Sequence, residues 1–318
     1  VEAEYVVIGR RIVLLDQHTT GDGLLARCLV PASSPYLAGI LNEEKHHGAY
    51  NGTVDGKPYL WIGNTSRDQY SGVFFGLGVA YEMIPDGETR ALIRSLVTSM
   101  LDRLLQDDWA VRTPAGVSTA FWGRPDQQLS LLIIGRLVNP DRFRRTYEWQ
   151  RLLQAGAVAA PIAAETLDDH NSYFKFNLDV INFYNLLRLE QSSAWRRAYL
   201  WAYTILRRTL DGHANPHFNL IDRAVNGPDP GRDAETAALL EAWLRRPRTD
   251  EWVDLRGELE ACGPDRACSV IPVEKRARTD FLWQRSPFLL YGGGQGLVEG
   301  AGIDYILPYW MARYYGVL

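Results

Sequence analysis

The sequence predicts an all-α protein built from antiparallel helical hairpins and preceded by a short extended segment. From residue 64 onwards, apolar residues recur at helical spacing through most of the chain. Strongly apolar segments alternate with amphipathic ones, as expected where an inner helix is followed by an outer helix. The four predicted pairs are 67–84 with 88–109, 126–138 with 141–165, 172–190 with 194–210, and 216–225 with 234–245.

The N-terminal segment has a different pattern. Residues 1–13 mix β-branched residues with charges, and Gly21-Asp22-Gly23 is a turn signal before a second apolar run. This pattern predicts a β hairpin or an extended strap. We therefore expect residues 1–63 to pack as a strap on the main body, and residues 64–318 to form one helical domain.

The first predicted helix begins with a crowded polar turn. Ser66 is a good N-cap, and the positive end of the helix dipole favours a carboxylate at Asp68. The rest of the helix is so apolar that we expect it to be buried nearly all round. Polar residues at the start of a buried helix are costly unless they open onto a cavity or form a paired network.

Each later apolar helix also begins with a polar cluster. These starts follow one another at intervals of roughly 45–58 residues, about the length of two antiparallel helices and their turns. The helix starts are therefore expected to gather at one mouth. The four clusters are Arg67/Asp68, Arg124/Asp126, His170/Asn171 and Asn215/His217.

An alternation of this kind, over about residues 64–315, resembles the α/α toroids. The resemblance rests on the pattern of helices, and four clear pairs are fewer than the usual six unless the N-terminal segment and residues 281–315 supply the others. Such toroids are known mainly from glycoside hydrolases and polysaccharide lyases, and also from terpene cyclases and prenyltransferase subunits. The resemblance implies a carbohydrate-active enzyme, although a fold alone does not establish a function.

Hydrolysis of a glycoside normally uses two carboxylates. Asp68 is the first candidate, as a general acid or base whose pKa is set by the cavity. Asp126 and Asp169 are candidate partners at the same mouth, and Asp304 is a weaker one. The ordinary alternative is a structural role, because carboxylates in the first turn of a helix often pair with the helix dipole or with an arginine.

Elimination from a uronic acid is the alternative chemistry. It needs a group that neutralises the carboxylate and groups that move protons, and toroidal lyases use Asn, His, Tyr and Arg for these roles. The matching residues here are Arg67, Asn171, His217 and either Tyr70 or Tyr173, with Arg124 and His170 as further substrate contacts. Trp310 could stack on a sugar ring. The asparagines are also natural N-caps, and the aromatic residues could equally fill the core.

A third hypothesis is a non-catalytic extracellular scaffold or binding protein. Hydrophobic residues make up 46% and charged residues 23% of the chain, as in soluble globular proteins. The net charge of −4 and the lack of a long basic run give no electrostatic reason to expect nucleic acid as a partner. Apolar segments are interrupted before the roughly 20 residues that a membrane span requires.

The sequence predicts neither a metal nor a cofactor. The glycine-rich run at residues 292–296 lacks the Lys-Ser/Thr of a phosphate-binding loop, and His46-His47 has no converging ligands. Cys262 and Cys268 could form a local disulfide in an exported protein, or could be a reduced pair in a cytoplasmic loop. The chain starts at Val1, so we expect that a leader or an upstream segment has been removed. The expected location is secreted or periplasmic, with a cytoplasmic location as the alternative. The oligomeric state is left open.

Overall fold

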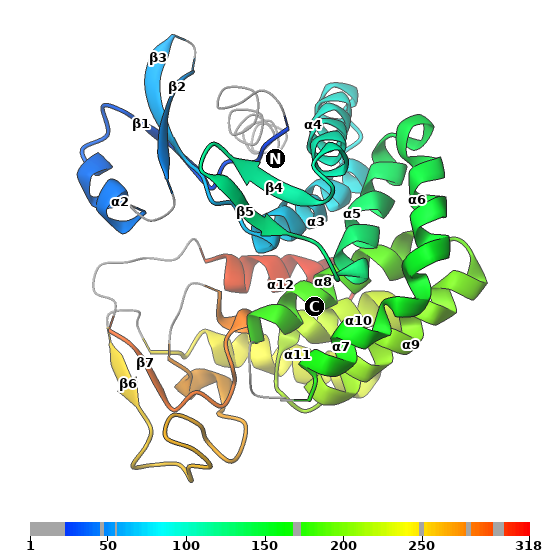
Figure 1. The fold of residues 1–318 in the computed structure, drawn as a ribbon. Helices are drawn as coiled ribbons and strands as arrows, with labels where there is room; N and C mark the ends of the chain where they lie inside the picture. Colours follow the sequence, from blue (N-terminus) through cyan, green and yellow to red (C-terminus); the bar gives the residue numbers. More distant parts are fainter. Residues whose placement is uncertain are drawn as a thin grey trace. The chain divides into compact units, whose positions relative to one another are not determined.

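The computed structural model describes residues 23–44, 48–54, 56–167, 173–247, 251–277, 281–294 and 302–318. This part of the chain is mainly helical, with three small antiparallel sheets (Figure 1). It divides into two compact units: unit 1 is Val1–Val158 with Leu189–Trp195, and unit 2 is Ala159–Arg188 with Arg196–Leu318. The predicted boundary between residues 63 and 64 lies inside unit 1. Within the described ranges, no helix is long and apolar enough to cross a membrane.

The predicted helices are confirmed, with boundaries shifted by a few residues. The predicted helix 141–165 is interrupted by a short 3-10 turn, Ala155–Ala157. The helices are α2 (Leu37–Glu43), α3 (Arg67–Met83), α4 (Gly87–Gln106), α5 (Pro125–Val138), α6 (Pro140–Gln154), α7 (Ala159–Glu165), α8 (Tyr173–Leu189), α9 (Ser193–Leu210), α10 (Pro216–Asn226), α11 (Pro230–Trp243) and α12 (Ile303–Tyr314). The closed toroid remains a prediction.

A three-stranded antiparallel sheet precedes the first long helix in unit 1. Its strands are β1 (Cys28–Pro31), β2 (Ala49–Val54) and β3 (Lys57–Ile62), in the order β1-β3-β2. Tyr50 on β2 packs against its cross-strand partner Trp61 on β3, with ring centroids 4.4 Å apart. Cross-strand aromatic pairs of this kind stabilise a sheet. The described N-terminal part of the chain therefore contributes a small sheet, whereas residues 1–22, where most of the predicted hairpin or strap falls, lie outside the described residues.

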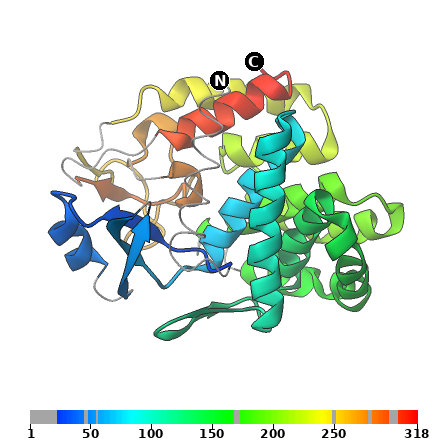
Figure 2. The same ribbon diagram turned by 90° about the horizontal axis from the view of Figure 1, so that it is seen from above.

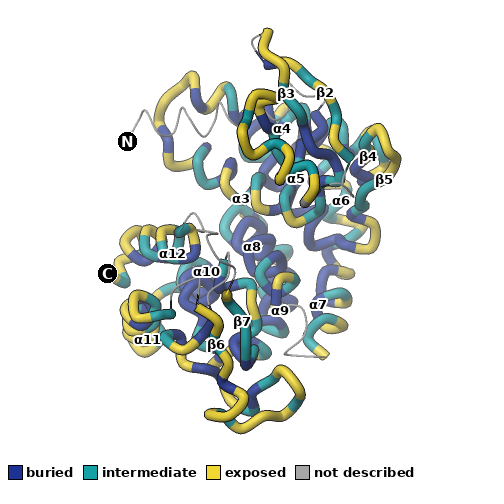
Figure 3. The backbone as a smooth tube through the Cα atoms, turned by 90° about the vertical axis from the view of Figure 1, so that its left-hand side faces the viewer, coloured by how far each residue is buried: buried dark blue, intermediate teal, exposed yellow. Residues whose placement is uncertain are grey.

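Helices α3 to α6 form the helical body of unit 1. Helix α5 is buried along most of its length, whereas α4 and α6 bury one face each (Figure 3). Gly78 on α3 allows close packing, because a Cβ there would lie 2.4 Å from Cδ1 of Ile134 on α5. The expectation that α3 is buried nearly all round was wrong. Gly72 and Gly76 face open space, so α3 buries only one side.

A β hairpin joins α4 to α5. Strands β4 (Ala110–Thr113) and β5 (Gly116–Ala120) flank a turn at Pro114 and Ala115. Figure 2 shows the hairpin beyond the C-terminal end of α4. Ser118 on β5 donates from its hydroxyl to the carbonyl of Thr65 at 3.1 Å. The hairpin is therefore tied to the segment that leads into α3.

Residues 189–195 attach to unit 1 through a buried carboxylate. Glu190 accepts hydrogen bonds from the Tyr147 hydroxyl at 2.6 Å, from Nη1 of Arg151 at 2.9 Å and from the Ser192 amide at 2.8 Å. Burial raises the pKa of the Glu190 carboxyl, but these hydrogen bonds outweigh it and the pKa is lowered. A buried carboxylate that is satisfied in this way fixes the chain before α9 begins.

Helices α8 to α12 form the helical body of unit 2. Helices α8 and α10 are buried along most of their length, and α9 and α11 bury one face each (Figure 3). In this unit, helices that are mostly buried thus alternate with helices that bury one face, as the sequence predicted. Between α9 and α10, Asn215 caps α10 by accepting from the Phe218 amide at 3.1 Å, and it donates to the carbonyl of Trp283 at 3.0 Å.

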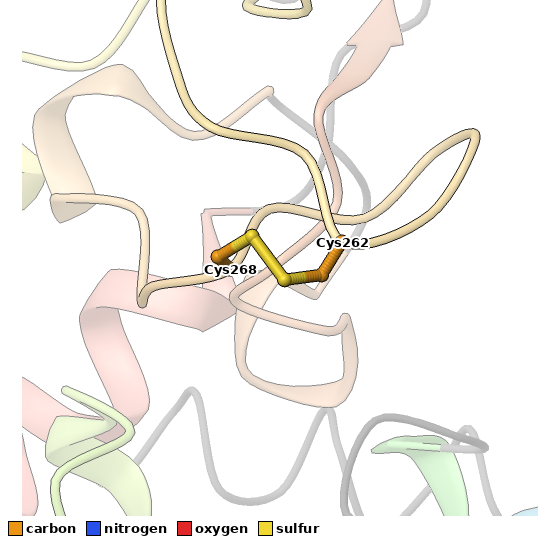
Figure 4. Close-up of a disulfide and its surroundings, with 2 residues drawn as sticks. All are labelled: Cys262 and Cys268. Atoms are coloured by element: carbon orange, nitrogen blue, oxygen red, sulfur yellow. A yellow bond between two sulfur atoms is a disulfide. The ribbon is translucent and has the colours of Figure 1, made fainter.

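Residues 251–294 form a loop-rich region with its own small core. Strands β6 (Trp252–Asp254) and β7 (Tyr291–Gly293) pair here. They pack against a buried cluster of Leu255, Ala267, Ile271 and Leu290. Cys262 and Cys268 form a disulfide within this region (Figure 4). The open question about these cysteines is thus answered by a local disulfide, which closes a loop whose ends also pair between Ala261 and Ala267.

Candidate functional site

The helix start around Asp68 lies in unit 1. Ser66 is the N-cap, and its amide donates to Oε1 of Gln69 at 2.8 Å. Asp68 is exposed. Surrounding protein atoms partly desolvate its carboxyl and so raise the pKa, whereas the positive charges of Arg67 and Arg27 lower it. Asp68 therefore remains available to a ligand, as a carboxyl group that holds its proton more readily than usual.

Tyr70, a predicted substrate contact, is a core residue. It is buried, and its hydroxyl accepts a hydrogen bond from the Leu25 amide at 3.2 Å. Its ring packs edge-on against Phe121. Tyr70 therefore anchors the segment before β1, which is the alternative that the sequence left open for the aromatic residues.

Arg124 and Asp126 form a buried ion pair at the start of α5. Nε of Arg124 lies 3.1 Å from Oδ1 of Asp126, and Nη2 lies 2.9 Å from Oδ2. The Asp126 side chain is fully buried. Its position in the first turn adds the favourable helix dipole to the bidentate pair. This geometry gives Asp126 a structural role and engages the guanidinium that we expected to contact substrate.

Three of the predicted site residues, Asp169, His170 and Asn171, lie outside the described residues. Of the others, Arg67, Asp68, Tyr70, Arg124 and Asp126 belong to unit 1, and Tyr173, His217 and Trp310 belong to unit 2. The single mouth at which all helix starts gather is therefore still a prediction.

A tyrosine–histidine pair lies at the start of α8 in unit 2. The hydroxyl of Tyr173 is hydrogen-bonded to Nδ1 of His213, and both residues are buried. The Tyr173 ring stacks on Phe218 of α10, with an interplanar angle of 13°. Phe288 packs edge-on against the His213 ring. These rings fix the two polar atoms toward each other, so a proton can pass between them.

Arg276 supports this pair from the loop-rich region. Its buried guanidinium donates to three carbonyls: Ile271 at 2.8 Å, Ala214 at 3.1 Å and His213 at 3.3 Å. Burial lowers the pKa of Arg276 to about 10, and the neighbouring Tyr173 acts in the opposite direction. Arg276 is therefore still a cation at neutral pH, and it holds the turn that carries His213.

Neither His213 nor Arg276 was among the residues predicted from the sequence. His213 lies two residues before the N-cap Asn215, in a turn where Gly212 and Ala214 both adopt positive φ angles. A histidine so close to a predicted helix start was the signal that could have drawn attention to it. Arg276 gave no comparable signal, because it contacts this turn from a loop about sixty residues further along the chain.

His217, a predicted catalytic residue, is buried between aromatic rings. Phe281 packs edge-on against it at 5.5 Å between ring centroids. Among the described side chains, Nδ1 of His217 finds no hydrogen-bond partner. Burial lowers its pKa to about 3, so the imidazole is neutral at neutral pH. It therefore cannot supply the positive charge that would neutralise a uronate carboxylate.

This burial predicts a pH-dependent stability. In an unfolded chain the pKa of a histidine is about 6.5. Between pH 6.5 and 3 the unfolded state therefore binds one more proton than the folded state. The free energy of unfolding should therefore fall as the pH drops through this range, by about 1.4 kcal/mol per pH unit from His217 alone. Urea titrations at several pH values should show a smaller slope for His217→Leu than for the wild type; equal slopes would contradict a neutral buried imidazole.

A second polar cluster of unit 2 surrounds Asp222 on α10. Its carboxylate accepts from the Tyr203 hydroxyl at 3.0 Å, from Nδ2 of Asn226 at 2.8 Å and from Arg232. A cavity of about 340 Å³ adjoins it, lined by both arginines and aspartates. Because the charges of this cluster compensate each other, we interpret it as a link between α9, α10 and α11.

Trp310, the predicted sugar platform, lies on an aromatic surface of α12. Its side chain is 64% exposed and meets the ring of Tyr309 edge-on. Tyr309 stacks on Tyr305, which in turn packs against Trp243 of α11. Trp310 is the exposed ring of this row, whereas Tyr305 and Tyr309 are half-buried, and an exposed ring offers a flat apolar face on which a sugar ring can stack. This position is compatible with the role that the sequence suggested.

Within the described ranges, no three His, Cys, Asp or Glu side chains gather as ligands for a metal ion. Comparison with known proteins gives no relative: no family model, no curated protein and no solved structure matches the chain. The function must therefore be argued from the residues of the site.

Proposed function

We propose that the protein is a carbohydrate-active enzyme that cleaves an acidic polysaccharide by elimination. The observation that carries this proposal is the hydrogen bond between Tyr173 and His213 at the start of α8. Tyrosine and histidine are two of the residue types that move protons in such lyases. Asp126, one of the carboxylates that hydrolysis would need, is engaged by Arg124. The elimination hypothesis therefore gains support relative to hydrolysis.

Once a substrate reaches the buried Tyr173 hydroxyl, the pair would carry out the proton transfers of an elimination. His213 takes the phenolic proton of Tyr173 through Nδ1, and the phenolate oxygen then removes the C5 proton next to the uronate carboxylate. The electrons of the C5–H bond form the C4=C5 double bond while the C4–O4 bond breaks. The leaving oxygen receives the proton that Tyr173 now carries, and His213 returns its own proton to Tyr173. All protons are thus accounted for.

Arg276 favours these proton transfers without touching the reacting atoms. A buried cation near Tyr173 favours the phenolate over the neutral phenol. The three carbonyls that Arg276 binds also hold His213 in place, so the acceptor nitrogen needs no reorientation before it takes the proton. We assign neutralisation of the substrate carboxylate to Asn171, which the sequence places two residues before Tyr173.

Hydrolysis is the second candidate, and one observation favours it. Asp68 is exposed at the start of α3, and its pKa is raised, as a general acid requires. A hydrolase would still need a second carboxylate, for which Asp169 and the weaker candidate Asp304 remain from the sequence.

A single assay separates these functions. The wild type and Asp68→Asn would be incubated with polygalacturonate, alginate and a glucuronan, while the ultraviolet absorbance of unsaturated uronide and the number of reducing ends are recorded. Elimination predicts that both signals rise together and that Asp68→Asn retains them. Hydrolysis would be established instead if the wild type released reducing ends without a rise in absorbance and Asp68→Asn released none. Binding of the polysaccharide without either signal would identify a scaffold.

A further inference from the structure

Unit 1 contains a cavity on α4 that no part of the proposed chemistry uses. Its volume is about 800 Å³, within the range of about 300–1,000 Å³ that is typical of small-molecule sites. The lining residues come from the end of α3, from one side of α4 and from the residue after α5. They are Tyr81, Gly87, Arg90, Ala91, Arg94, Ser95, Thr98, Ser99 and Asn139.

The charge of this lining is one-sided. Among the described residues that line it, two are arginines and none is acidic. Asp86 is close in sequence, but its carboxylate accepts the Thr89 amide at 2.6 Å as the N-cap of α4. Within the described ranges, neither Arg90 nor Arg94 has a carboxylate partner. The cavity around Asp222 differs in this respect, because its arginines are matched by aspartates.

The two guanidinium groups are held in place by Tyr81. Arg90 lies over the Tyr81 ring, with Cζ 4.4 Å from the ring centroid. Arg94 donates from Nη2 to the Tyr81 hydroxyl at 3.2 Å and from Nε to the carbonyl of Val138 at 2.7 Å. The hydrogen bond from Arg94 lowers the pKa of Tyr81, as a positive field does. Both arginines are thus arranged before any ligand arrives, which reduces the entropic cost of binding.

The remaining lining groups are neutral hydrogen-bonding side chains. Arg90, Arg94 and Thr98 follow one another at intervals of four residues along α4, and Ser95 and Ser99 form the neighbouring row. Asn139 donates from Nδ2 to the Thr98 hydroxyl at 3.0 Å, which leaves that hydroxyl free to donate elsewhere. Hydroxyls beside a pair of arginines match a ligand that carries both an anionic group and several hydroxyls.

We propose that this cavity binds an anionic sugar through its carboxylate, sulfate or phosphate group. Arg90 and Arg94 bind the oxyanion, because guanidinium groups match its geometry and remain charged at all relevant pH values. Ser95, Thr98 and Ser99 bind the hydroxyls of the sugar ring. The cavity is too large for a bare ion, so the sugar body contributes to affinity. This site stands on its own geometry and is independent of the chemistry at Tyr173.

Calorimetric titration of the full chain tests this proposal with four probes: glucuronate, glucose 6-sulfate, glucose 6-phosphate and neutral glucose. We expect at least one charged sugar to bind, glucose to bind at least about tenfold more weakly, and the affinity to fall with added salt. The strongest of the three charged probes identifies the anionic group. Failure of all three to bind at millimolar concentration would overturn the proposal.

Variants assign the binding to this cavity. Arg90→Gln leaves the bond from Arg94 to Val138 intact, so it should fold normally and weaken binding of the charged sugar about tenfold. Arg94→Lys keeps the charge but loses the planar guanidinium that can donate two parallel hydrogen bonds, so it should also weaken binding. Arg145→Gln is the matched control, since it removes the same charge from an exposed site on α6 and should leave the affinity unchanged. Unchanged affinity in Arg90→Gln, or an equal loss in Arg145→Gln, would refute the assignment.

Discussion

Replacing Tyr173 by phenylalanine should lower turnover of an acidic polysaccharide by about 100- to 10,000-fold, the usual contribution of a positioned acid–base group. The substitution removes only the hydroxyl that binds Nδ1 of His213 and keeps the ring that stacks on Phe218. Turnover would be measured by the absorbance of the unsaturated product, at substrate concentrations that separate kcat from KM. We expect the loss to appear mainly in kcat, because the hydroxyl acts in the transition state.

The control for this experiment is Tyr203→Phe. Tyr203 is also buried in unit 2, and its hydroxyl donates a hydrogen bond to Asp222 at 3.0 Å. Both variants should be destabilised to a similar extent, by about 1–3 kcal/mol, because each removes a hydrogen bond to a buried polar group. Only Tyr173→Phe should lose turnover. Equal turnover in the two variants would show that the Tyr173–His213 pair is structural.

The second large effect concerns the ion pair at the start of α5. Arg124→Met should destabilise the protein by about 3–5 kcal/mol, because it leaves the buried carboxylate of Asp126 without its charge partner. The double variant Arg124→Met/Asp126→Leu should recover much of this loss, since apolar groups then replace both charges. Urea unfolding of both single variants and the double variant gives the coupling free energy.

This cycle also decides whether Asp126 could be a catalytic acid. If Arg124→Met costs less than about 1 kcal/mol, the value typical of exposed ion pairs, the carboxylate is solvated and remains a candidate for hydrolysis. A large coupling energy would confirm its structural role.

The helices could be predicted because their signals are local. Pro125 at the first position of α5, the N-cap Asn215 and the apolar periodicity of α8 all act within a few residues of where they stand. The strands were harder to predict. β3 has the sequence Lys57-Pro58-Tyr59-Leu60-Trp61-Ile62, which has no regular alternation of polar and apolar residues, and its pairing with β1 and β2 depends on distant segments.

The candidate site was harder to predict because its geometry depends on long-range contacts. The ion pair of Asp126 with Arg124 is local, and the sequence offered such a pairing as the structural alternative. Tyr173 was a predicted site residue, yet its partner His213 lies forty residues further along the chain, and Arg276 arrives from a third segment. The apolar sequence of α3 similarly cannot show that Gly72 and Gly76 are exposed.

The chemical structure of the product tests the central claim most directly. Mass spectrometry of oligosaccharides released from an acidic polysaccharide distinguishes elimination from hydrolysis, because elimination leaves a C4=C5 double bond and adds no water. We predict unsaturated uronide at the new non-reducing ends, formed by the wild type and lost in Tyr173→Phe. Saturated ends that incorporate oxygen from isotopically labelled water would contradict elimination at this pair.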